Sequence, residues 1–184
     1  MGASWRKIGS GSGPALILVV TLLVGCTIVS VHPKVPRDAQ PSEINGYVGG
    51  LFDKDTIVGF GFGLQDEQTG KEYVLELEDN VVGLVAVPPG RYRVAYWVTW
   101  AALTGDRLTQ QAIPRSHPFG HDFEVRPGQV TFLGHWSADR QMHFRSNTFT
   151  LAPVAITEAE ARDALHTAYP SFATERIQCV FCAL

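Results

Sequence analysis

The sequence predicts a mainly β protein: an antiparallel Greek-key-type β-sandwich of one domain, with one C-terminal α-helix and a hydrophobic segment at the N-terminus. Three observations predict this arrangement. Between residues 46 and 151, short apolar runs recur with glycine and proline turns between them, which is typical of a sandwich. After Thr157 the apolar residues take helical spacing. Near the N-terminus, one uninterrupted apolar run follows two basic residues.

Residues 1–25 have the three parts of an export signal. Arg6 and Lys7 form the positive region, a glycine- and serine-rich spacer follows them, and residues 15–24 form the apolar region. The segment is therefore expected to direct the rest of the chain out of the cytoplasm.

The apolar run ends in Leu23-Val24-Gly25-Cys26, which resembles the lipobox of bacterial lipoproteins. The resemblance implies that Leu23, Val24 and Gly25 are recognised, and that the chain is cut before Cys26. It also implies that Cys26 carries the covalent lipid, which consists of a diacylglyceryl group and an N-linked acyl chain such as palmitate. Two or more buried chains suffice for stable membrane anchoring. The expected location is the cell envelope. In Gram-negative lipoproteins the residue after the cysteine influences sorting, and Thr27 instead of Asp favours the outer membrane, with the domain facing the periplasm.

An uncleaved membrane helix is the alternative explanation of this segment. Apolar character continues past Cys26 to Val31, so residues 15–31 make 17 residues, at the short end of what spans a bilayer. Both explanations keep the basic residues on the cytoplasmic side and place the domain outside.

The part after the signal has the size and charge of one globular domain that does not bind nucleic acid. Cutting before Cys26 leaves 159 residues with 13 basic and 18 acidic side chains, a net charge of −5 without a basic cluster. Residues 26–43 contain Pro33, Pro36 and Pro41 and are expected to be the lipidated N-terminus and a flexible tether. The sandwich domain is expected at 44–184.

The first expected strands show which residues face the core. Residues 46–52 make a glycine-rich strand, and residues 57–64 place Val58, Phe60, Phe62 and Leu64 on one face and three glycines on the other. Such a glycine face lets another backbone approach closely. After a turn at 66–71, apolar and acidic residues alternate through residue 78, which predicts a strand with one wet face.

The clearest expected hairpin runs from Val82 to Val98 and turns at Pro88-Pro89-Gly90. Its return strand is expected to direct four apolar residues inward: Tyr92, Val94, Tyr96 and Val98. A second unit of this kind, Phe123 to Gly134, turns at Pro127-Gly128, and residues 142–151 are expected to form a last long strand.

These two units resemble exported lipoprotein domains with a transthyretin-like (prealbumin-like) sandwich. The residues that carry the resemblance are 88–94, Pro-Pro-Gly-Arg-Tyr-Arg-Val, followed by 123–134 with its Arg-Pro-Gly-Gln-Val turn. It covers about half of the exported part, and its motifs encode strands and turns. It implies a binding or structural module and carries over no catalytic residue.

Residues 157–168 are expected to form the helix. Thr157 and Glu160 make a capping box, Pro170 ends the helix, and Ala161, Leu165 and Ala168 form its buried stripe. Residues 172–182 could add one more strand.

Cys179 and Cys182 are the candidate disulfide. Residues three apart on an extended strand lie too far apart to bridge, so the bond requires a turn in this segment. Free thiols and a link to another chain remain alternatives, whereas a redox catalyst is disfavoured because the motif does not open a helix.

Trp97, Trp100 and Trp136 are the candidate partner surface. Trp97 is expected on the face opposite Tyr92 and Val94, where it is either covered or exposed to an envelope protein partner.

His117 and His121 are four apart, but Pro118 and Gly120 argue against the helix that would aim both at a metal, so no metal site is expected. No catalytic motif stands out at recognisable spacing. The sequence therefore favours a non-enzymatic binding or structural module on a lipid anchor, with no cofactor and with its ligand undefined. An envelope hydrolase or thiol-dependent enzyme is the alternative, and so is a single-span membrane protein.

Overall fold

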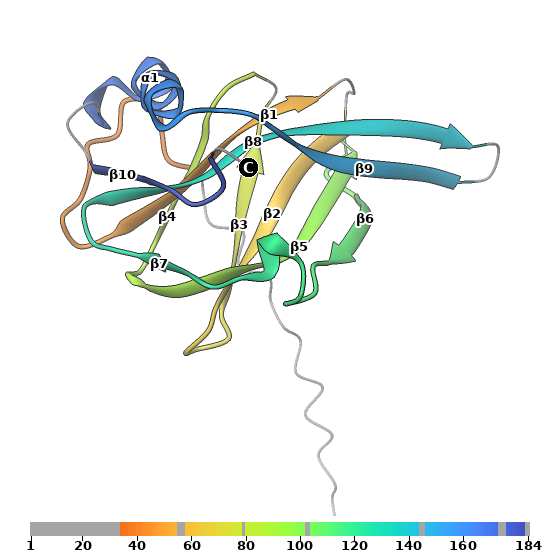
Figure 1. Cartoon of the computed structure of the whole chain (residues 1–184), viewed down its shortest axis with the longest axis horizontal. Coiled ribbons are helices and arrows are strands. Elements are labelled where there is room, and N and C mark those ends of the chain that lie inside the picture. Colours follow the sequence, from red (N-terminus) through yellow and green to blue (C-terminus); the bar gives the residue numbers. More distant parts are fainter. Residues whose placement is uncertain are drawn as a thin grey trace, which may run out of the picture.

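The protein is mainly β, with two sheets packed face to face and one helix (Figure 1). The computed structural model describes residues 34–54, 58–78, 80–101, 104–143, 146–172 and 176–182. The signal segment, with Leu23, Val24, Gly25 and Cys26, lies outside the described residues. Within them, no helix is long and apolar enough to cross a bilayer.

Sheet A has the strand order β10-β8-β1-β4, with β9 also paired to β8. Its strands are β1 (Gly46–Lys54), β4 (Gly83–Val87), β8 (Gln129–His143), β9 (Ser146–Val154) and β10 (Arg176–Cys179). The prediction of an antiparallel fold needs correction here, because β8 runs parallel to both β1 and β10.

Sheet B has the strand order β3-β2-β5-β6, with β7 also paired to β5, and it is antiparallel throughout. Its strands are β2 (Val58–Asp66), β3 (Glu72–Leu77), β5 (Gly90–Ala101), β6 (Arg107–Ala112) and β7 (Phe123–Val125).

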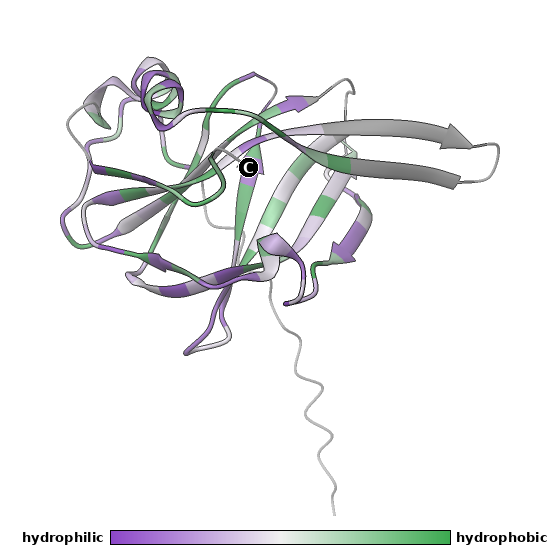
Figure 2. Ribbon diagram, viewed as in Figure 1, coloured by the Kyte–Doolittle hydropathy of each residue, from purple (hydrophilic) through white to green (hydrophobic). Residues whose placement is uncertain are grey.

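The main core lies between the two sheets and is rich in aromatic rings. Phe52 of β1 stacks on Phe60 of β2 with ring centroids 4.3 Å apart, which joins the sheets directly. The inward residues expected on β2 and β3 are confirmed, since Phe60, Phe62 and Leu64 are buried here together with Tyr73, Leu75 and Leu77. Figure 2 shows hydrophobic residues along these strands, whereas the β2–β3 turn and most of β6 are hydrophilic.

A second core covers the outer face of sheet A. The helix α1 (Glu158–Ala168) packs there with Ala161 and Leu165 fully buried, beside the 3-10 turn η2 (Pro170–Phe172). The capping box at Thr157 and Glu160 is confirmed. Thr157 donates from its backbone N–H to the Glu160 carboxylate, and this lowers the pKa of that carboxyl.

Residues 34–43 are not a free tether. Val35 is buried in the second core, and its N–H donates to the Leu84 carbonyl at 3.1 Å. Arg37 donates to the Val82 carbonyl and pairs with Glu78. The folded domain therefore includes this segment, because it has apolar and charged partners on the sheet edge.

The expected hairpin at Pro88-Pro89-Gly90 is wrong. β4 belongs to sheet A and β5 to sheet B, so the chain crosses between sheets at this point. Proline lacks the N–H that a hairpin ladder uses and holds the backbone extended. The Tyr92 hydroxyl donates to the Pro88 carbonyl at 2.8 Å and braces the crossing. Pro127-Gly128 makes a second crossing, from β7 to β8.

The long strand expected at 142–151 is also wrong, because β8 ends at His143 and β9 starts at Ser146 as its antiparallel partner. Its apolar and β-branched composition suits both arms of a hairpin, and the local sequence has neither proline nor glycine to mark the reversal. The two strands extend past the sandwich as an arm (Figure 1).

A bulge in β5 reverses the expected orientation of its second half. Leu64 pairs with Val94 but Gly63 pairs with Tyr96, so Ala95 is an extra residue. Tyr92 and Val94 face the core as expected, whereas Trp97 now faces inward and Tyr96 and Val98 face the outer side of sheet B.

The glycine face of β2 is filled by these outward aromatic residues. A Cβ on Gly59 or Gly61 would meet the ring of Trp100, and one on Gly63 would overlap the ring of Tyr96. Burial raises the pKa of Tyr96 to about 12, and the carboxylate of Glu72, which accepts from its hydroxyl, adds to the effect.

Gly61→Ala tests this packing. The new Cβ would lie 2.7 Å from the Leu75 carbonyl oxygen, a backbone atom that cannot turn away, so the free energy of unfolding is expected to fall by about 1–3 kcal/mol. Urea unfolding measures the loss. Gly90→Ala is the control, because its Cβ meets only a ring atom at 3.5 Å; equal losses in the two variants would contradict the packing.

Candidate functional site

A groove lies at one edge of the sandwich, where the connection from β6 to β7 passes the base of β9. Its volume is about 250 Å³. Buried Trp97, Ile113 and Phe119 form its floor. Its rim is formed by residues from both sheets and from the connecting loop: Gln111, Ala112, Pro114, His117 and Leu151.

The loop that forms one wall, residues 113–122, is shaped by proline and glycine. The Ile113 N–H donates to the Ala95 carbonyl at 2.8 Å, so the loop starts at the bulge of β5. The 3-10 turn η1 (Pro118–Gly120) follows, and Gly120 sits where a Cβ would overlap the Pro114 carbonyl. This close approach holds the ring of Phe119 at the groove floor.

His117 presents a hydrogen-bond donor at the rim. Its Nδ1 accepts from the Phe119 N–H at 3.3 Å, so the neutral ring carries its proton on Nε2. The ring lies 4.9 Å from that of Phe119. The groove thus combines an aromatic floor with an imidazole N–H and the Gln111 amide at its rim.

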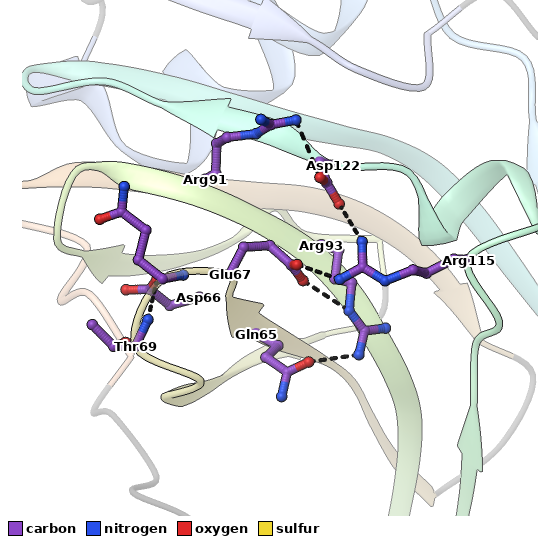
Figure 3. Close-up of polar contacts among 9 residues, drawn as sticks. Gln65, Asp66, Glu67, Thr69, Arg91, Arg93, Arg115 and Asp122 are labelled. Carbon is purple, nitrogen blue, oxygen red and sulfur yellow. Dashed lines mark hydrogen bonds and ion pairs between the residues drawn. The ribbon is translucent and has the colours of Figure 1, made fainter.

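A chain of ion pairs holds this loop against sheet B (Figure 3). Arg115 of the loop pairs with Glu67 in the β2–β3 turn and with Asp122, at 3.0 Å for the second pair. Glu67 also lies 2.9 Å from the Arg93 guanidinium, and Asp122 lies 3.2 Å from that of Arg91. Hydrogen bonding to Glu67 is the larger cause of the raised pKa of Arg115, with Asp122 second.

Within this chain of ion pairs, the pair between Glu67 and Arg93 is expected to contribute most to stability. The side chains of Glu67 and Arg93 are 19% and 18% exposed, whereas Arg115 is 58% exposed. Partly buried charge pairs are screened less than surface pairs. Glu67 is therefore the residue that positions the loop, and through it the groove.

A second hollow, of about 550 Å³, lies where the sheet crossings at Pro89 and Pro127 meet the β2–β3 turn. It is more open than the first groove, and its charged residues pair with their neighbours: Arg91 with Asp122, and Arg126 with Glu124 at 2.7 Å. The first groove is the better candidate, because it is less open and has a floor of buried aromatic and aliphatic side chains with a few polar groups at its rim.

The predicted partner surface is not one surface. Trp97 is 6% exposed and Trp136 is 1% exposed, and both face the core, so of the two alternatives left open for Trp97 the covered one is confirmed, and neither indole forms an exposed surface. The bulge at Ala95 turns Trp97 inward, and the Trp136 indole donates to the Leu133 carbonyl at 2.7 Å. Trp100 is half-buried on the outer face of sheet B.

The other predicted residues are also placed. Cys179 and Cys182 are joined by a disulfide with Cα atoms 5.5 Å apart, because the chain turns directly after β10. His117 is on the groove rim, and His121 is exposed after η1. Among the described residues, no three histidine, cysteine or acidic side chains cluster as a metal site.

Sequence reasoning missed most of the groove: Gln111, Ile113, Phe119 and Leu151. One signal could have found two of them. Ile113 and Phe119 are lone apolar residues in a polar, proline-rich segment, a pattern typical of a loop that folds back on a core.

No protein-family model matches the chain, and no curated protein matches it either. Among solved structures, the crystal structure of a leucine-rich repeat protein from Bacteroides thetaiotaomicron matches with 19% identity and a TM-score of 0.33. The match covers 53% of this chain and 14% of that chain. At that TM-score it carries no argument about fold or function.

The ion-pair chain yields a testable prediction. Glu67→Ala removes the common partner of Arg93 and Arg115 and leaves the partly buried Arg93 guanidinium without a carboxylate, bonded only to the neutral Gln65 amide, so the free energy of unfolding is expected to fall by about 2 kcal/mol. Amides of residues 114–121 should exchange hydrogen faster.

Arg162→Ala is the matched control, because it breaks an exposed i,i+4 pair on α1 that contributes about 0.5 kcal/mol or less. Unchanged exchange in the loop of the Glu67 variant would show that the ion pairs do not position it.

Proposed function

We propose that the protein is a lipoprotein of the cell envelope, anchored by lipid on Cys26, whose sandwich is a non-enzymatic binding module. The groove over Trp97 and Phe119 carries the proposal. The proposed location is the outer membrane, facing the periplasm, where the source is Gram-negative. The two packed sheets, and the four connections by which the chain passes from one sheet to the other, support assignment to transthyretin-like sandwiches of Greek-key type.

The size of the groove limits its occupant. Sites for drug-sized ligands are about 300–1,000 Å³. A volume of about 250 Å³ is smaller and suits one ring system or one large apolar side chain. We assign it to an aromatic or branched side chain of an envelope protein partner, which would stack edge-on against the floor.

The disulfide supports the proposed location. Disulfides form and persist in oxidising compartments such as the periplasm and are rare in the cytosol. The bond between Cys179 and Cys182 therefore agrees with an exported domain, as the signal segment and its lipobox predict.

One preparation tests both halves of the proposal: protein extracted from its native membranes, with a photo-crosslinking amino acid in place of Gln111. Before irradiation, the intact mass should equal that of residues 26–184 plus the diacylglyceryl and acyl groups. The Cys26→Ala variant should lack the diacylglyceryl group and the acyl groups. The mass of an uncleaved, unmodified chain would contradict the lipid anchor and support a retained helix.

After irradiation, the crosslinker at Gln111 should give adducts of defined mass. Ala112→Trp should suppress them, because Ala112 is an exposed rim residue and a large ring there would fill the groove. Asp163, exposed on α1, is the control position. The same adducts from both positions, or adducts that persist with Ala112→Trp, would contradict the binding groove.

A further inference from the structure

The C-terminal segment closes the sandwich behind the groove. Parallel pairing of β10 with β8 ends at Cys179, opposite Phe132. The chain then turns, with the Val180 N–H donating to the Phe132 carbonyl at 2.9 Å, and the disulfide joins Cys179 to Cys182. The bond therefore encloses two residues, Val180 and Phe181.

Phe181 is the residue that this turn inserts into the core. Its side chain is 8% exposed and belongs to the cluster between the sheets. Its ring packs edge-to-face against Phe119 at 4.8 Å and against Trp136 at 6.2 Å. Since Phe119 is part of the groove floor, Phe181 supports the groove from behind.

β8 is adapted to receive the turn. Gly134 has φ +92°, a conformation that favours glycine, and a Cβ there would lie 2.9 Å from the Phe181 carbonyl oxygen. The backbone of the turn thus lies directly on β8. Because the backbone of Gly134 and that of Phe181 lie so close together, a change in the shape of the turn would disturb this contact.

We propose that the Cys179–Cys182 disulfide is a thiol–disulfide exchange site, at which a dithiol protein of the envelope releases Phe181 and loosens the groove floor. Both cysteine residues are partly exposed, and access of a thiolate to the disulfide is a requirement of exchange. Strand pairing with β8 ends at Cys179 and the Val180 N–H adds one more hydrogen bond, so the disulfide is the covalent constraint that holds the turn beyond them.

The exchange balances without another reagent. A thiolate of the dithiol protein attacks one sulfur, forms a mixed disulfide and displaces the other cysteine as a thiolate, which takes a proton from solvent. The second thiol of that protein, as its thiolate, then attacks the mixed disulfide. The products are a disulfide in the dithiol protein and two thiols, Cys179 and Cys182. The groove's role rests on the proposed function, whereas the exchange and the release of Phe181 do not.

Hydrogen exchange of the full-length protein tests the inference, with reduced thioredoxin as the dithiol probe. Peptide mass analysis should show both cysteines reduced. Amides of residues 117–120 and 132–136 should then exchange about tenfold faster, while those of α1 stay unchanged, because local opening need not involve the whole domain.

Two variants make the result decisive. Cys179→Ser/Cys182→Ser should show the fast exchange with and without thioredoxin, and Phe181→Ala should show it while the disulfide is intact. Unreduced cysteines, or unchanged exchange around Phe119 after reduction, would overturn the inference. Faster exchange throughout α1 and both sheets would also overturn it, since the bond would then be a general stabiliser. None of these outcomes depends on the lipid or on a groove partner.

Discussion

One extra residue in β5 decides where the aromatic side chains of sheet B point. Side chains alternate between the two faces of a strand, so inserting Ala95 exchanges the faces of every residue after it. Before the bulge, Tyr92 and Val94 fill the core; after it, Trp97 does. Without the insertion, Trp97 would face outward and the groove would lose its floor.

The same bulge explains the glycines of β2. With Tyr96 and Trp100 on the outer face, their rings need space over the neighbouring strand, and Gly59, Gly61 and Gly63 supply it. Inside, Phe119 forms part of the groove floor, and Phe181 packs against it from behind. The bulge, the loop of residues 113–122 and the C-terminal turn therefore all hold the same groove in place.

The sequence predicted the elements better than their connections. The β2 and β3 core faces and the α1 capping box depend on residues near in sequence, and both were predictable. The residues at Pro88-Pro89-Gly90 predict a hairpin where the structure has a sheet crossing, because proline and glycine suit both. The face of β5 on which Trp97 lies was predicted wrongly, since the bulge that reverses it is set by pairing across the sheet. The groove joins segments far apart in the chain, so local patterns could not assemble it.

Hydroxyl-radical footprinting of Trp97, Trp100 and Trp136 tests the central claim most directly, because one experiment reports the face on which each of these indoles lies. The account predicts that Trp100 is oxidised fastest, that Trp97 is slower because it is covered except at the groove, and that Trp136 is slowest. Oxidation of Trp97 as fast as that of Trp100 would contradict the bulge, and with it the groove.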